Sequence, residues 1–221
     1  MERMIKVTGK GSLAVKPDQI RLMLEIQDSR ASYEKTIESS TLQVEDLRNV
    51  FEELGFDRAD LKTTYFNVDT KYHRYTDENG CFQNRFVGYE FTHRLKIEFD
   101  ADTKRLGQIL YALAHAPVMP EFRIVYTVKD VEASKNQLLG KAVADSKEKA
   151  LVLTEAAGVK LGEIINIDYS WGEVEFSYEP MNRMMYASAL PAEDNVGSFN
   201  MDIEPDDIDV SDTVTVIWSI Q

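Results

Sequence analysis

The sequence has a single cysteine, Cys81, and only three histidines among its 221 residues. One cysteine excludes an intramolecular disulfide, so a reducing compartment is compatible with the chain. The histidines, His73, His93 and His115, share no spacing typical of zinc ligands. Catalytic serine motifs of the G-x-S-x-G type are missing. We therefore predict that the protein is not an enzyme and that it has no catalytic residues, no metal site and no cofactor.

Basic residues are also scarce, with 25 Lys and Arg against 38 Asp and Glu, for a net charge of −13. An acidic chain repels phosphate backbones, so nucleic acid is a poor partner. No apolar run approaches the roughly 18 residues of a membrane span. The start, from Met1 to Val7, lacks the apolar segment of a secretion signal. We expect a cytoplasmic protein, although a chain whose leader had been removed would look the same.

Two patterns suggest ligand chemistry but lack its context. Gly9 and Gly11 form a G-x-G, yet a phosphate-binding fingerprint needs a third glycine and a following helix. We predict a turn between two strands there, followed by a second strand from Ile20 to Gln27. The acidic run from Asp202 to Asp212 lacks the spacing and glycine of a calcium loop, and we interpret it as a solvated turn.

The stretch from Glu132 to Tyr169 predicts a long helix, a glycine stop and a strand. Small and apolar side chains recur at spacings of three and four along one helical face, namely Leu139, Ala142, Ser146, Ala150, Leu153 and Ala157. A face of small residues lets a helix lie close against a sheet. After Gly162, the residues Ile165, Ile167 and Tyr169 alternate as in a strand.

An earlier helix has the clearest amphipathic stripe. Its apolar side is made of Tyr33, Ile37, Ser40, Val44, Leu47, Phe51 and Leu54. Ser29 or Ser32 can cap its start, and Gly55 is placed to end it. The period of seven is compatible with a coiled coil, but few charge pairs flank it, so we favour packing against a sheet.

Two long strands, Leu61–Tyr75 and Arg85–Phe99, flank an Asn79-Gly80 hairpin signal. Both exceed the usual strand length, so we predict that the hairpin projects from the domain. Its tip carries four aromatic residues, Tyr72, Tyr75, Phe82 and Phe86. They form either an oligomer contact or cross-strand pairs within the hairpin. Cys81, at the turn, is a reactive thiol or, more simply, an incidental exposed one.

Shorter patterns complete the chain. Asp102 begins a helix that buries Leu106, Ile109, Leu110 and Leu113, and strands are predicted at 121–128 and 208–220. From about 171 to 205 the pattern dissolves into an irregular insertion rich in methionine. Methionines make adaptable apolar contacts, so Met181, Met184 and Met185 are candidates for a partner contact, or else the insertion is simply mobile.

Several motifs, taken in order, resemble the SIMPL-domain family, a domain of unknown function. They are Val7-x-Gly9-x-Gly11 with Pro17-Asp18, Ala142-x-x-Asp145-x-x-x-Lys149-Ala150, Gly158-x-x-Leu161-Gly162-Glu163-Ile164, and Ile203-Glu204-Pro205. The resemblance covers nearly the whole chain and implies self-assembly and a loose association with bacterial stress tolerance and surface antigens. Typical members carry a secretion signal and are periplasmic. The family has no established catalytic residues to carry over.

We therefore expect one SIMPL-like domain over residues 1–221, of the α+β class, with a mainly antiparallel sheet. Two long helices and one shorter helix pack on it, and a long hairpin projects. The expected function is a non-enzymatic scaffold that forms homo-oligomers, and the resemblance implies a stress-related role; any other protein partner is unknown. The alternative is a module that binds a small ligand or peptide in a cleft beside the hairpin and the methionine-rich stretch.

Overall fold

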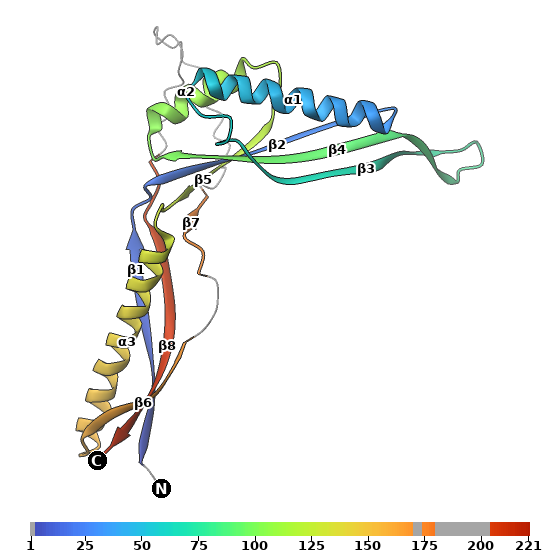
Figure 1. The fold of residues 1–221 in the computed structure, drawn as a ribbon. Coiled ribbons are helices and arrows are strands. Elements are labelled where there is room, and N and C mark those ends of the chain that lie inside the picture. The colour runs from blue at the N-terminus through green and yellow to red at the C-terminus, as the bar shows by residue number, and fades with distance from the viewer. Residues whose placement is uncertain (1–2, 170–173, 180–203) are drawn as a thin grey trace, which may run out of the picture. The chain divides into compact units, whose positions relative to one another are not determined.

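The computed structural model describes residues 3–169, 174–179 and 204–221. It has the predicted α+β class, with three helices and antiparallel strand pairing in the described residues (Figure 1). The chain divides into two compact units. The terminal unit comprises Met1–Asp18, Tyr126–Tyr178 and Pro205–Gln221, and the central unit comprises Gln19–Val125 and Glu179–Glu204. Because the units interleave along one chain, the single domain expected over residues 1–221 stays a prediction.

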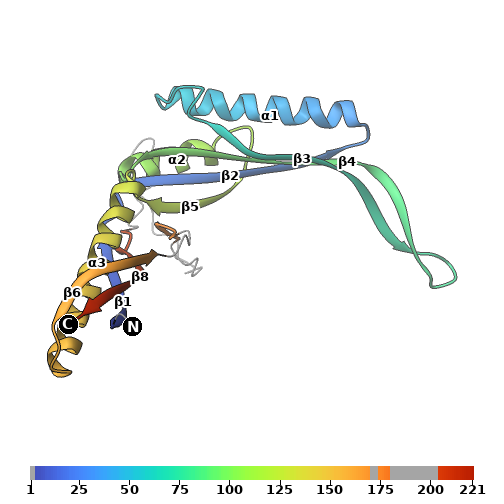
Figure 2. The same ribbon diagram turned by 60° about the horizontal axis from the view of Figure 1, so that its bottom comes forward.

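The central unit is a sheet with the strand order β3-β4-β2-β5. Its elements in chain order are β2 (Gln19–Arg30), α1 (Tyr33–Glu53), β3 (Lys62–Thr76), β4 (Phe82–Asp100), α2 (Thr103–Ala114) and β5 (Glu121–Thr127). Figures 1 and 2 show α1 lying along the sheet. The sheet-packing interpretation of this helix is therefore confirmed.

The core of the central unit follows the alternation in its strands. Every second residue of β2, from Ile20 to Ile26, is buried, and the inward row of β4 adds Phe91, Leu95 and Ile97. The stripe of α1 covers these rows with Val44, Leu47 and Phe51, as predicted. Burying one such side chain contributes roughly 1.5–3 kcal/mol.

Both helices of the central unit begin at the predicted caps. The Oγ of Ser32 accepts a hydrogen bond from the N–H of Lys35 at 3.5 Å. The carboxylate of Asp102 accepts bonds from the N–H groups of Lys104 and Arg105 at 2.8 and 3.3 Å. Such caps satisfy backbone donors that have no partner inside the helix. Gly55 follows α1 with a φ of 83°, as a terminating glycine does.

The terminal unit is a sheet with the order β1-β8-β6, with α3 packed on β1 and β8. Its elements are β1 (Met4–Val15), α3 (Val131–Ala156), β6 (Leu161–Tyr169), β7 (Ser177–Tyr178) and β8 (Ile208–Ile220). Tyr126 and Thr127, the last two residues of β5, belong to this unit and pair with the short β7, which lies within the stretch expected to be irregular. Phe176 beside it is buried. The closing strand has the predicted bounds.

The two early glycines were predicted in a turn, and this prediction is wrong. Gly9 and Gly11 lie in the middle of β1, opposite Val214 and Asp212 of β8. A Cβ on Gly9 would lie 2.0 Å from the carbonyl oxygen of Ala142, and one on Gly11 would lie 2.2 Å from that of Leu138. The glycines are needed because α3 approaches the backbone of the strand too closely for any side chain.

The buried face of α3 also differs from the prediction. Ala142, Ser146 and Ala150 are buried as expected, but Leu153 is about half exposed. The rest of the face is formed by Leu138 and Thr154, so buried residues recur at every fourth position. A row of every fourth residue slants across a helix, and this slant lets the face follow a twisted strand.

Candidate functional site: the aromatic arm

The central unit carries a two-stranded extension, which we call the arm and define as residues 71–88. β2 ends at Arg30, which lies opposite Tyr89 of β4. Beyond this pair, β4 is paired only with β3 among the described residues. Figures 1 and 2 show the arm continuing past the end of α1. An isolated hairpin is marginally stable in water, so the arm needs support at its tip, at its root or from a partner.

The tip of the arm is held by the carboxylate of Asp77. Its Oδ1 accepts hydrogen bonds from the N–H groups of Asn79 and Cys81, at 3.0 and 2.9 Å. Its Oδ2 accepts one from the amide of Gln83 at 3.2 Å. These bonds, led by that from Cys81, hold the pKa of Asp77 below its ordinary value. With Gly80 at a φ of 79°, the turn is ordered by the chain itself.

Aromatic rings form a chain from the arm to the helix. Tyr72 lies directly opposite Phe86, with ring centroids 5.8 Å apart in an edge-to-face arrangement. Phe86 contacts Tyr89 at 5.4 Å, and Tyr89 contacts Tyr33 of α1 at 5.5 Å. Edge-to-face pairs add about 0.5–1.5 kcal/mol beyond the area they bury. The cross-strand interpretation is therefore confirmed for Tyr72 and Phe86.

Cross-strand pairing nevertheless leaves the arm's aromatic rings in water. Tyr72, Tyr75, Phe82 and Phe86 remain between 44% and 68% exposed. Tyr75 lies opposite Gln83 and Phe82 opposite Thr76, so neither is covered by a ring across the ribbon. The guanidinium of Arg74 lies over the ring of Phe82, 4.2 Å from its centroid. The four predicted contact residues are thus exposed together on one ribbon.

The root of the arm is a glycine beside the end of β2. Gly88 has a φ of 144°, and a Cβ there would lie 2.2 Å from the carbonyl oxygen of Arg30. The β3–β4 register shifts between Lys71 and Tyr72, opposite this glycine. The ammonium of Lys71 forms an ion pair with Glu90 and donates to the Oγ of Ser29 at 3.4 Å. The arm is therefore anchored where β2, the strand next to β4 in the sheet, ends.

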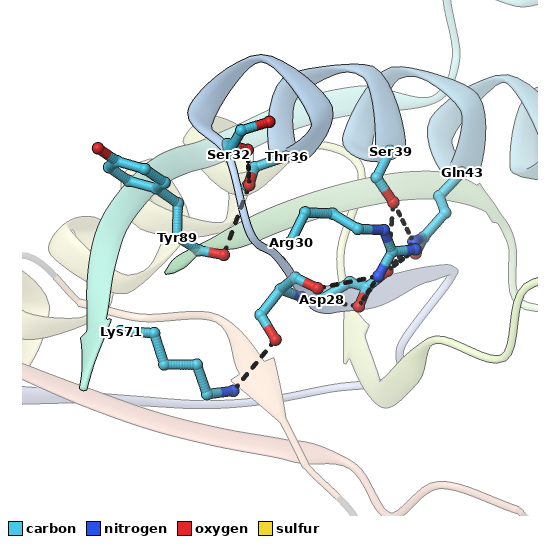
Figure 3. Close-up of polar contacts among 9 residues, drawn as sticks. Asp28, Arg30, Ser32, Thr36, Ser39, Gln43, Lys71 and Tyr89 are labelled. Atoms are coloured by element: carbon cyan, nitrogen blue, oxygen red, sulfur yellow. Dashed lines mark hydrogen bonds and ion pairs between the residues drawn. The ribbon is translucent and has the colours of Figure 1, made fainter. Parts of the chain in front are cut away.

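A polar network joins this root to α1, as Figure 3 shows. The carboxylate of Asp28 accepts hydrogen bonds from Arg30 at 2.6 Å, Ser39 at 3.2 Å and Gln43 at 3.0 Å. Partial burial alone would raise the pKa of Asp28. The bonds from the Ser29 N–H and from Arg30 outweigh burial and lower this pKa. The carboxylate of Asp28 is thus ionised at neutral pH, and its bonds from Ser39 and Gln43 connect β2, which ends at the root of the arm, to α1.

His93, which the sequence analysis considered only for zinc binding, contacts α1 through Ser40. Nδ1 of His93 is 3.1 Å from the Oγ of Ser40, and its Nε2 is 2.8 Å from the Oγ1 of Thr63. Burial and the nearby charge of Arg48 lower the pKa of His93. The only sequence signal was position, because His93 continues the inward row of Phe91 and Leu95.

A cleft of about 560 Å³ lies on the central unit at the base of the hairpin. Its walls include the exposed rings of Tyr65 and Phe122. In the same cleft, Arg94 donates to the carboxylate of Glu25 at 2.8 Å, and its guanidinium lies 5.2 Å from the ring centroid of Tyr65. Arg123 also lines the cleft. This mixed apolar and charged lining suits a small amphipathic ligand or a short peptide.

The other residues and site types considered in the sequence analysis have less structural support as functional sites. Met181, Met184 and Met185 lie outside the described residues. Cys81 is exposed beside the tip of the arm. Across residues 3–169, 174–179 and 204–221, no group of three His, Cys, Asp or Glu residues is placed to hold a metal ion. In the same residues, every helix is too short or too polar to cross a membrane.

Comparison with known proteins supports the resemblance noted from the motifs. The chain is 24% identical over 177 residues to proteins named "26 kDa periplasmic immunogenic protein" from Brucella melitensis and Brucella abortus. The match covers 80% of this chain and 68% of each relative. Both relatives are named as periplasmic, so the expected cytoplasmic location has no support from them. The sequence profile of the SIMPL family, described as "protein of unknown function (DUF541)", matches residues 5–218, and the chain therefore belongs to the SIMPL family.

Proposed function

We propose that this protein is a non-enzymatic, self-associating scaffold in which the arm of one copy binds another copy. The observation that carries the proposal is the set of four exposed aromatic rings on a two-stranded ribbon that continues past the end of α1. Aromatic residues are enriched in the buried centres of protein interfaces. The family's association with stress tolerance makes a stress-related role part of the same proposal.

The order within the arm favours binding. Forming an interface costs conformational entropy for each side chain that becomes fixed. In the arm, Tyr72 and Phe86 already rest against each other, and Asp77 already holds the turn. A partner would therefore meet rings whose positions are largely set, at a smaller entropic cost. Burying them would also support a ribbon that is marginal by itself.

The test is native mass, measured by size exclusion with light scattering over a wide range of concentration. The intact chain is compared with a variant in which residues 71–85 are replaced by a short glycine turn. We expect an oligomer for the intact chain and a folded monomer for the trimmed chain. A strictly monomeric intact chain, or a trimmed chain that assembles equally well, contradicts the proposal.

Two variants with point substitutions keep the test valid if the trimmed chain does not fold. Tyr72→Ser with Phe82→Ser removes two exposed rings and keeps the turn. Leu42→Ser is the matched control, because Leu42 is an exposed apolar residue on α1, outside the arm. The arm variant should dissociate while the control remains assembled. Equal behaviour of the two would show that the arm has no special part in assembly.

The second candidate function is a small-ligand or peptide-binding module that uses the cleft at the base of the hairpin. The lining by Tyr65, Phe122, Arg94 and Glu25 favours it. A ligand that binds only the folded state raises the unfolding temperature. A metabolite and peptide screen should then give a thermal shift that Arg94→Ala removes. A broad screen without any shift would count heavily against this function.

A further inference from the structure

The outer edge of β6 is unusually apolar for the edge of a sheet. In the order β1-β8-β6, β6 is an edge strand with no neighbour on its outer side among the described residues. Ile164, Ile165 and Ile167 are each 44–47% exposed. Helix α3 packs mainly on β1 and β8 and touches β6 less, and the three isoleucine side chains remain about half exposed. An exposed apolar edge is a template for pairing with another strand.

The opposite edge of the same sheet is protected. The N–H of Lys10 on β1 donates to the carboxylate of Asp145 at 2.6 Å. The ammonium of Lys141 donates to the carbonyl oxygen of Ser12 at 3.2 Å. Helix α3 thus covers part of the β1 edge with its own polar side chains. Of the two edges, only that of β6 has neither a neighbouring strand nor such side-chain bonds to its backbone from α3 within the described residues.

The charges on β6 indicate what kind of strand fits. Glu163 and Asp168 are exposed on it, and neither carboxylate has an ion-pair partner in the described part of the chain. The outer strand of the arm, from Lys71 to Thr76, has the opposite character. It bears Arg74, as well as Lys71, which is paired with Glu90 at the root; it bears no acidic residue and is itself at the edge of the central sheet.

We propose that the open edge of β6 receives the β3 edge of the arm from a second copy of the chain. This inference rests on the proposed function and names the surface that the arm binds. Pairing two β3 edges or two β6 edges would bring like charges together, whereas β3 with β6 brings opposite charges together. The contact is heterologous, since it joins two different surfaces of the same chain. Each copy can bind one neighbour through its arm and a second neighbour through its β6 edge.

One antiparallel register satisfies both charge and apolar contacts. Placing Arg74 opposite Asp168 also places Tyr75 opposite Ile167. An ion pair and an aromatic pair with a β-branched residue are both favourable directly across two strands. Tyr72–Thr76 and Asn166–Tyr169 are each paired in regular register with their own neighbours, so these two stretches can align without a bulge.

Charge reversal tests the contact. Arg74→Glu and Asp168→Arg should each weaken association by about tenfold, since each sets like charges opposite one another. An equal mixture of the two variants should assemble again, because every contact then joins opposite charges. Asp209→Arg, the same charge change at an exposed position on β8, is the control and should assemble normally.

The outcomes separate this inference from the proposed function. If trimming the arm abolishes assembly but Asp168→Arg assembles like the intact chain, the arm binds elsewhere and this inference alone is overturned. If the mixture of reversed variants stays monomeric, the inference is overturned too. A second measurement uses Tyr75→Cys and Ile167→Cys in a Cys81→Ser background. Mixing these two variants under oxidation should give a disulfide-linked pair, and its absence from an assembled sample contradicts the register.

Discussion

The carbonyl oxygen of Arg30 lies 2.2 Å from the point where a Cβ on Gly88 would be. This contact occurs where β2 ends and the arm begins, so the geometry of the arm depends on the absence of one side chain. The φ of Gly88, 144°, is also one that other residues rarely adopt. The root of the arm can therefore be tested by substitution.

Gly88→Ala should destabilise the protein by roughly 3 kcal/mol or more, because it combines backbone strain with overpacking. Gly55→Ala is the control, since its φ is also positive but nothing lies within 4 Å of the added Cβ. The control should cost only about 1–2 kcal/mol. Urea unfolding of both variants measures the difference. Equal losses would mean that the carbonyl of Arg30 moves aside at little cost.

Gly9→Ala should also be strongly destabilising, by roughly 3 kcal/mol or more, because the new methyl group meets the backbone of α3 and neither backbone can easily move. Gly140→Ala, on α3 itself, is the contrasting change. Nothing lies within 4 Å of a Cβ there, and alanine favours a helix over glycine by roughly 0.5–1 kcal/mol. Chemical denaturation should show the two substitutions moving stability in opposite directions. A tolerated Gly9→Ala would contradict the close approach.

Stability should depend on pH through His93. Its pKa in the folded protein lies below the value of about 6.5 expected in the unfolded chain. The unfolded chain therefore takes up the proton first as the pH falls. The stability from neutral His93 is complete above about pH 6.5 and is lost as the pH falls toward the folded pKa. Urea unfolding between about pH 5 and 8 should show this loss in the natural chain, and less of it in His93→Gln, which keeps a polar group between Ser40 and Thr63.

The arm's ring pair should show energetic coupling. A double-mutant cycle with Tyr72→Ala and Phe86→Ala should give a coupling free energy of about 0.5–1.5 kcal/mol between the two rings. Tyr75→Ala with Phe82→Ala forms the control cycle, because these positions lie on opposite faces of the ribbon and should be nearly additive. Hydrogen exchange of the arm amides is the suitable measurement, since the arm can open without global unfolding. Additive effects for Tyr72 and Phe86 would show that their contact contributes nothing.

Elements whose signals are local were predictable. Asp102 begins a helix because its own carboxylate reaches two N–H groups in the next turn. Asn79-Gly80 marks the hairpin because Gly80 adopts a positive φ. The inward row of β2 followed from strict alternation. In each case the physical cause lies within a few residues along the chain, so the pattern alone specifies it.

Features that depend on which elements meet were not predictable. The sequence pattern around Gly9 is typical of a turn, and only the packing of α3 against β1 explains why a glycine is needed within a strand. Leu153 fits the apolar stripe of α3 by its spacing, but the buried row slants across the helix and leaves it half exposed. The isoleucines of β6 follow a strand pattern whether a helix covers them or not. His93 has no motif, and only the fold brings Ser40 and Thr63 to its two nitrogens.

The sequence by itself therefore determined the three helices of the described residues, the caps of α1 and α2, and the projecting hairpin with its turn and aromatic residues. Their causes are backbone conformation and hydrogen bonds between near neighbours. The tertiary structure alone decided that Gly9 and Gly11 let α3 pack on β1, that Gly88 at the root of the arm lies against Arg30, and that β6 has no outer neighbour among the described residues. Those outcomes depend on close contacts and burial between residues far apart in the chain, which no local pattern records.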